Sequence, residues 1–163
     1  MALGRVEQRE RIYYLSITNG KIVHNDKGKR NIYAFVEGKL EGINLTERTF
    51  NGEKVPYWFI NLRGEKGELF VISLPYKSGT FKSIVLALAS VPTLGKVVKV
   101  EPYERNGYTK VVVSLNEKRL DWVTQELPPV EDIKIAGQTV KDDTKRMEYI
   151  TQLVEVVNKG EEK

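Results

Sequence analysis

The chain has 163 residues, 40% hydrophobic and 29% charged, a balance typical of one soluble globular domain. It has no cysteine, which excludes a disulfide framework, a thiolate metal site and a cysteine nucleophile. Its single histidine is His24. The net charge is +4, and residues 128–163 carry six basic and eight acidic side chains, so the positive charge lies in residues 1–127 and suggests a polyanionic partner.

The N-terminal part of the chain predicts a β-hairpin. Two short strands are expected between Arg11 and Val23, joined at Asn19-Gly20. This dipeptide favours a two-residue turn in which both residues have a positive φ. A polar, basic loop is expected over residues 25–31.

Three strands and one helix follow. Gly38 and Gly42 predict bends in the first strand, and a polar loop or ribbon tip is expected over Thr46–Val55. Apolar residues at helical spacing predict an amphipathic helix over Ser78–Ser90, with Ser78 as its N-cap. The three expected strands are Ile32–Leu45, Tyr57–Arg63 and Leu69–Tyr76.

Two more strands, Lys96–Tyr103 and Tyr108–Leu115, are expected around a turn at Asn106-Gly107. The consecutive prolines Pro128 and Pro129 predict the end of the main domain, because proline interrupts both helices and central strands. We therefore expect a domain over residues 1–127 and, over 128–163, a linker and a C-terminal helix from Lys141 to Asn158.

Three strands, one helix and two strands is the element order of the OB-fold. The segment from Ile32 to Leu115 resembles the OB-fold single-stranded DNA-binding proteins of the phage or mobile-element type. The resemblance implies a mainly β protein, a five-stranded Greek-key barrel with one helix between strands 3 and 4, here extended by the N-terminal hairpin and the C-terminal helix. It also implies that the second and third strands and the two long hairpin loops contact the nucleic acid. The bacterial members end in an acidic tail with an apolar tip, whereas this chain ends in Asn158-Lys159-Gly160-Glu161-Glu162-Lys163.

Alternation along the expected strand Tyr57–Arg63 separates two faces. Trp58, Ile60 and Leu62 form an apolar face that should point into the barrel. The opposite face has two aromatic rings, an amide and a guanidinium, which suit stacking on bases and pairing with phosphates. The alternative is that this face packs under the N-terminal hairpin or against another subunit. In the third strand, Val71 and Ser73 are expected to face outward.

The candidate contacts are aromatic, basic or amide side chains at outward strand positions or in hairpin loops. Their rings would stack on bases and their cations would hold phosphates, although Glu37 and Glu41 argue against a uniformly positive groove and Tyr108 could instead cap the core. The predicted nucleic-acid-binding residues are Phe35, Lys39, Arg48, Phe50, Lys54, Tyr57, Phe59, Asn61, Arg63, Lys66, Arg105, Tyr108 and Lys110.

The sequence contains neither a phosphate-binding Gly-x-x-x-x-Gly-Lys motif nor a dinucleotide fingerprint. We expect no enzyme, no catalytic residue, no metal and no cofactor. The predicted function is to coat and protect single-stranded DNA, with little sequence preference, during replication or recombination. The alternatives are RNA as the ligand, and a structural or assembly module that uses the same barrel face for protein contacts.

Partners and location follow from the same reasoning. One OB-type domain covers few nucleotides, so we expect a homo-oligomer, and contacts with replication proteins are also expected. No apolar run reaches the roughly 18 residues that cross a bilayer, and the first residues do not resemble a signal peptide. We expect a cytoplasmic protein, in the host cytoplasm if a phage encodes it, with no membrane partner.

Overall fold

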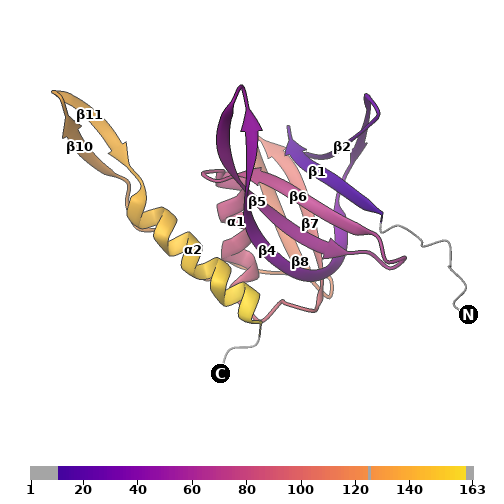
Figure 1. Cartoon of the computed structure of the whole chain (residues 1–163). Helices are drawn as coiled ribbons and strands as arrows, with labels where there is room; N and C mark the ends of the chain where they lie inside the picture. The colour runs from indigo at the N-terminus through magenta and orange to yellow at the C-terminus, as the bar shows by residue number, and fades with distance from the viewer. Residues whose placement is uncertain (1–10, 125, 161–163) are drawn as a thin grey trace, which may run out of the picture.

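The chain folds around one long, curved β-sheet (Figure 1). The computed structural model describes residues 11–124 and 126–160. Nine strands form the sheet, in the order β3-β2-β1-β6-β5-β4-β7-β8-β9, and β10 and β11 form a separate ribbon. The elements are β1 (Ile12–Thr18), β2 (Lys21–Asp26), β3 (Lys29–Tyr33), β4 (Val36–Phe50), β5 (Glu53–Arg63), β6 (Leu69–Pro75), α1 (Gly79–Leu88), β7 (Val97–Arg105), β8 (Tyr108–Leu115), β9 (Lys118–Arg119), β10 (Glu131–Ile135), β11 (Gln138–Asp142) and α2 (Thr144–Lys159).

The core lies between the concave side of the sheet and α1. Trp58, Ile60 and Leu62 of β5 are all buried, as their alternation predicts. The ring of Trp58 stacks on Phe81 of α1, with the two centroids 4.7 Å apart. The predicted N-cap is confirmed, because Ser78 Oγ accepts a hydrogen bond from the backbone amide of Phe81 at 3.2 Å.

The prediction of a closed five-stranded barrel is wrong. Closure would require β6 to pair with β8, but β6 pairs in parallel with β1, from Ile12 opposite Leu69 to Leu15 opposite Ile72. The N-terminal hairpin thus occupies the position of the closing strand and enlarges the sheet. Local sequence patterns do not encode which distant strand takes a free sheet edge, so this pairing was not visible in the sequence.

The two sides of the curved sheet meet by packing instead of by a hydrogen-bonded ladder. The predicted Asn19-Gly20 turn is confirmed, and it lies against β7 and β8. The amide of Gly20 donates a hydrogen bond to Thr109 Oγ1 at 3.2 Å. A Cβ atom on Gly20 would lie 2.6 Å from the backbone nitrogen of Glu104, so only glycine fits at this contact.

Strand β4 bends at the two predicted glycines. A Cβ atom on Gly38 would lie 2.8 Å from the carbonyl oxygen of Arg63, which shows how closely β4 and β5 cross. At Gly42, where φ is +149°, the register between β4 and β5 shifts by a β-bulge. The bulge changes which residues of β4 share a face with the outward residues of β5.

The predicted loop over residues 25–31 is paired strand, whereas the ribbon alternative predicted for Thr46–Val55 is confirmed. Residues 25–31 form the end of β2, a turn at Lys27-Gly28 and the start of β3, because polar residues can pair as well as apolar ones in an exposed ladder. The segment Thr46–Val55 is a continuous ribbon, in which β4 and β5 pair as far as Phe50 and Glu53. The ribbon projects from the body of the sheet (Figure 1).

The C-terminal segment contains more than a linker and a helix. The ribbon of β10 and β11 precedes α2, which begins at Thr144 rather than at Lys141. Helix α2 buries Ile150 and Val157 in the same hydrophobic cluster as α1. The side chain of Asn158 hydrogen-bonds both the amide (2.8 Å) and the carbonyl (2.7 Å) of Ile43 beside the bulge. The helix therefore shares the core formed by the sheet and α1, while the ribbon extends away from it (Figure 1). None of the helices in the described ranges is long and apolar enough to cross a membrane.

Substitution of Gly20 tests whether the turn closes the two sides of the sheet. Gly28 is a matched control, because both glycines have a positive φ but a Cβ atom on Gly28 would meet nothing within 4 Å. Gly28→Ala should lower the free energy of unfolding by about 1–2 kcal/mol, the cost of the left-handed backbone alone. Gly20→Ala should cost a further ~1–3 kcal/mol, because the methyl group overpacks against β7. Urea denaturation measures both values, and equal losses would contradict this role for the turn.

Candidate nucleic-acid interface

The convex side of the sheet carries a continuous patch of aromatic and polar side chains. Cross-strand pairing aligns Tyr14, Val71 and Asn61 in one row, and Ser73, Phe59 and Asn44 in the next. These side chains point away from the core, since they alternate with the buried residues Leu15, Ile43, Trp58, Ile60, Ile72 and Leu74 along the strands. We call this patch the aromatic face, and it comprises Tyr14, Asn44, Arg48, Phe50, Tyr57, Phe59, Asn61, Val71 and Ser73.

Four aromatic rings on this face form two contacting pairs. The ring centroids of Tyr14 and Phe59 are 6.1 Å apart, and those of Phe50 and Tyr57 are 5.9 Å apart. Tyr14 is 53% exposed and Phe50 is 46% exposed, whereas Tyr57 and Phe59 are half-buried. The rings are thus held in place by one another and by the sheet, and part of their surface remains open to solvent.

The middle strand of the face is covered by its neighbours. Val71 and Ser73 lie on the convex side as predicted, but they are 3% and 8% exposed. Their burial follows from the larger side chains on the adjoining strands. Arg48 reaches over from the ribbon, where its Nη1 donates to Ser73 Oγ at 3.3 Å and its Cζ lies 5.4 Å from the centroid of the Tyr57 ring. The guanidinium is therefore positioned beside the rings by a hydrogen bond and a cation–π contact.

Asn61 is fixed on the face by two contacts with β4. Its Nδ2 atom donates to Asn44 Oδ1 at 2.8 Å and to the carbonyl of Gly42 at 3.4 Å. Both partners are accessible to Asn61 because the bulge at Gly42 turns Asn44 to the convex side. The predicted amide site is thus part of the face, in an orientation set by β4.

Arg63, a predicted phosphate contact, is paired with a carboxylate. Its Nε and Nη2 atoms donate to the two oxygens of Glu41, each at 2.9 Å, and its Nη1 atom donates to the carbonyl of Gly67 at 3.0 Å. The hydrogen bonds from Arg63 are the largest influence on the pKa of Glu41 and lower it. Burial, the next largest, raises this pKa, and the charges of Arg63 and then Lys39 lower it, so that the net shift is downward. This end of the face is therefore close to neutral.

Other predicted contacts lie apart from the aromatic face. Arg105, Tyr108 and Lys110 occupy the β7–β8 hairpin, and Tyr108 is 69% exposed. The contact of Gly20 with Glu104 places this hairpin beside the β1–β2 turn. Lys66 lies in the turn between β5 and β6, and Lys54 at the start of β5 in the ribbon; both are exposed. None of these four cations is a member of the aromatic face.

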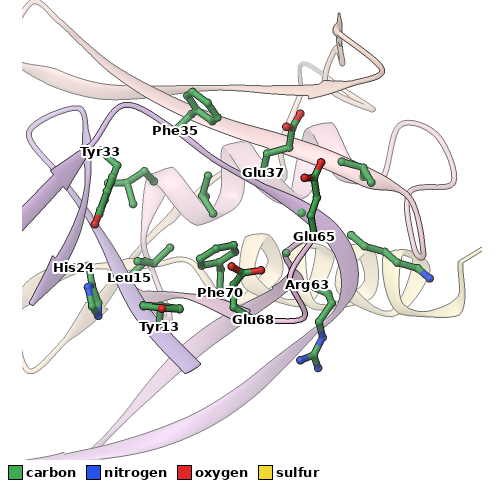
Figure 2. Close-up of a pocket in the computed structure, with 16 residues that line it drawn as sticks. Tyr13, Leu15, His24, Tyr33, Phe35, Glu37, Arg63, Glu65, Glu68 and Phe70 are labelled. Carbon is green, nitrogen blue, oxygen red and sulfur yellow. The ribbon is translucent and has the colours of Figure 1, made fainter. Parts of the chain in front are cut away.

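Phe35 and Lys39 line a groove instead of the aromatic face (Figure 2). The groove has a volume of about 730 Å³, and Glu37, Glu65 and Glu68 also line it. The ring of Phe35 lies under the ammonium group of Lys99, with 4.3 Å between Nζ and the ring centroid. Phe35 is therefore separate from the stacking surface of Tyr57 and Phe59.

Sequence reasoning missed Tyr14 and Asn44 as members of the aromatic face. The alternation in β1 could have placed Tyr14 outward, but its neighbour Phe59 depends on the parallel pairing of β1 with β6. Among the described residues, no three acidic or histidine side chains gather as a metal ion would require. The chemistry that the face offers is stacking, hydrogen bonding and the charge of its arginine.

The Glu41–Arg63 pair predicts a pH-dependent contribution to stability. Because Glu41 has a lowered pKa in the folded state, the pair stabilises the protein at neutral pH, and this contribution is lost as the pH falls through that lowered pKa. Glu41→Gln should cost about 0.2–1 kcal/mol at pH 7, the range for exposed ion pairs. The difference from wild type should shrink progressively as the pH is lowered from 7 to below the ordinary pKa of a glutamate, about 4.3. Urea denaturation over a series of pH values tests this, and a difference that stays constant would contradict it.

Comparison with known proteins gives no match: no protein-family model, no curated protein and no solved structure matches the chain. A functional conclusion must therefore follow from the residues themselves. The strongest feature that they offer is the set of paired rings beside Arg48 on the convex side of the sheet.

Proposed function

We propose that the protein binds single-stranded DNA on the aromatic face, without catalysing a reaction. The observation that carries this proposal is the contact of Arg48 with the ring of Tyr57, which pairs with Phe50 and lies on the same face as the pair formed by Phe59 and Tyr14. Unpaired bases expose flat apolar faces beside a charged backbone. A surface of rings and a guanidinium complements both parts of such a strand.

The arrangement of the rings favours binding with little sequence preference. Stacking of a base on an aromatic side chain contributes about 1–3 kcal/mol and tolerates every base. Tyr57 and Phe59 are half-buried above the small residues of β6, so little side-chain freedom remains to be lost on binding. The partly exposed rings of Tyr14 and Phe50 would extend the stacking surface at its two ends.

The charges around the face support an electrostatic contribution. Arg48 is exposed beside the rings, and Lys54 lies farther along the same ribbon. Arg105 and Lys110 on the neighbouring hairpin would hold more distant phosphates. Each phosphate contact with a single strand makes the binding constant fall by about 0.7 log unit per log unit of salt.

We further propose that β4 to β8 form an OB-type core. The order of β4, β5, β6, α1, β7 and β8 and the antiparallel pairing of β4 with β7 support this assignment. In this core the pairing of β6 with β1 of the N-terminal hairpin takes the place of the pairing of β6 with β8 that would close the barrel. The aromatic face then lies largely on the second and third strands, where the resemblance to single-stranded DNA-binding proteins implies that the nucleic acid binds.

A role as an assembly module is the second candidate. The ribbon of β10 and β11 supports it, because Ile133, Ile135 and Val140 are exposed on an element that projects from the core. A two-stranded ribbon is only marginally stable alone in water, so contact with another copy would stabilise it. Self-association is compatible with DNA binding, and the two candidates differ in whether DNA binds at all.

Replacement of single rings tests the proposed stacking. Phe59→Leu and Tyr57→Leu each keep an apolar side chain above β6 and remove the aromatic ring. Each should weaken binding of a fluorescently labelled oligo-dT by about tenfold, which corresponds to roughly 1.4 kcal/mol. Fluorescence anisotropy at low salt measures the affinity. Trp122→Leu is the control, since Trp122 is a partly exposed ring outside the face, and it should leave the affinity unchanged.

The same titration separates the candidates. No binding of oligo-dT by wild type at low salt would refute the proposal and favour the assembly module. Tighter binding of oligo-rU than of oligo-dT would assign the face to RNA. Wild-type affinity in both leucine variants would show that the rings of Tyr57 and Phe59 do not contact the ligand.

Replacement of Arg48 tests the phosphate contact. Arg48→Gln should lower the slope of log affinity against log salt by about 0.7, because one counterion-releasing contact is lost. Arg119→Gln, which removes the same charge from the exposed strand β9, should leave the slope unchanged. Equal slopes in wild type and Arg48→Gln would contradict the assignment of Arg48 to a phosphate.

A further inference from the structure

The groove at the start of β4 has an apolar floor and aromatic walls (Figure 2). Leu15, Ile22 and Val36 are buried at its base. The ring of Tyr13 contacts Phe70 and His24, with centroid distances of 5.6 Å and 5.2 Å. The walls are thus held by mutual packing before any ligand enters. Its volume of about 730 Å³ lies within the range of binding sites for ligands and peptide side chains.

Three carboxylates give the groove an acidic rim. Figure 2 shows Glu37 on one side of the groove, Glu68 on the other, and Glu65 near one end. None of the three forms an ion pair with another described residue. Glu68 is held in place, because its Oε1 accepts a hydrogen bond from the amide of Lys66 at 2.9 Å. The lining also includes Lys39 and Arg63, but two of the hydrogen bonds of Arg63 go to Glu41 outside the groove.

This charge distribution selects against a nucleic acid as the ligand of the groove. A phosphate backbone would meet three carboxylates, none of which forms an ion pair with a described residue. A cationic ligand gains from the same groups, and its apolar part can bury against the aromatic walls. The groove and the aromatic face therefore have opposite preferences, although Tyr13 and Tyr14 are neighbours in the same strand.

The backbone along the groove adds a feature suited to an extended peptide. Strand β4 pairs with β7 from Val36 to Lys39, whereas its ladder with β5 begins only at Lys39. On the β5 side, the edge of β4 at Val36 and Glu37 makes no ladder with another described strand, and both residues line the groove. A strand edge of this kind can pair with an added peptide, whose alternate side chains then enter the adjoining pocket.

We propose that the groove binds an extended basic peptide segment of a partner protein. Its large apolar side chains occupy the space between Tyr13, Tyr33 and Phe70, and its lysines or arginines pair with Glu37 and Glu65. Tyr33 is 49% exposed at the rim and shields these contacts from one side. This site goes beyond the proposed DNA-binding function and does not depend on it.

Two synthetic peptides test the site on the full chain. The probe is acetyl-Lys-Phe-Lys-Leu-Lys-amide, and the matched control replaces each lysine by glutamate. The basic peptide should produce saturable shifts of the backbone amide resonances of Gly38 and Gly64, two glycines in the groove lining. The acidic peptide should produce no saturable shift at these positions.

Charge-neutral variants of the rim test the specificity. Glu37→Gln combined with Glu65→Gln should weaken binding of the basic peptide about fivefold, as expected for the loss of two exposed ion pairs. The control combines Glu117→Gln with Glu155→Gln, an equal change of charge at exposed positions outside the groove, and should leave the affinity unchanged. Two-dimensional NMR spectra of the variants report whether each remains folded.

The outcomes for the two sites are distinguishable. The groove proposal is overturned if the basic peptide leaves Gly38 and Gly64 unshifted, if both peptides bind equally, or if the rim and control variants behave alike. Affinity for oligo-dT should change less than twofold in the rim variant, because its carboxylates lie off the aromatic face. Loss of DNA binding in that variant would show that the groove belongs to the DNA site instead.

Discussion

The parallel pairing of β1 with β6 is the interaction on which both binding surfaces depend. Because side chains alternate along a strand, β1 contributes Tyr14 to the convex side and Tyr13 and Leu15 to the groove. The same strand then leads into the turn at Gly20, which closes the sheet against β7. Without this pairing, Phe59 would lose its aromatic neighbour, Phe70 would lose Tyr13, and the edge of β6 would be free.

The bulge at Gly42 is a second constraint with consequences on both sides of the sheet. One extra residue in β4 reverses the alternation, so that Ile43 enters the core while Asn44 faces outward beside Asn61. A bulge disrupts the ladder locally and leaves backbone groups to be satisfied by other partners. Asn158 supplies both hydrogen bonds to Ile43, which links the C-terminal helix to the geometry of the aromatic face.

Local patterns predicted those features that depend on neighbouring residues. The two faces of β5, the cap at Ser78 and the Asn19-Gly20 turn are all set within a few residues. The parallel partner of β6 is set by residues more than fifty positions away, and nothing in the segment Arg11–Val23 specifies it. Burial of Val71 and Ser73 likewise depends on side chains from adjoining strands. The ribbon of β10 and β11 was missed because its turn has Ala136 at φ 52°, which lacks the usual asparagine signal.

The two surfaces meet at the Glu41–Arg63 pair. Arg63 lines the groove at one end and lies on the convex side of β5, and Glu41 keeps its charge balanced there. A polyanion on the aromatic face and a basic segment in the groove would then lie on opposite sides of a nearly neutral boundary. Screening at physiological ionic strength acts over about 8 Å, so charges bound on either side of this pair would attract each other where they come within that distance. Binding of either ligand would then raise the affinity of the other site for its own ligand, without a conformational change, because the two bound charges attract each other.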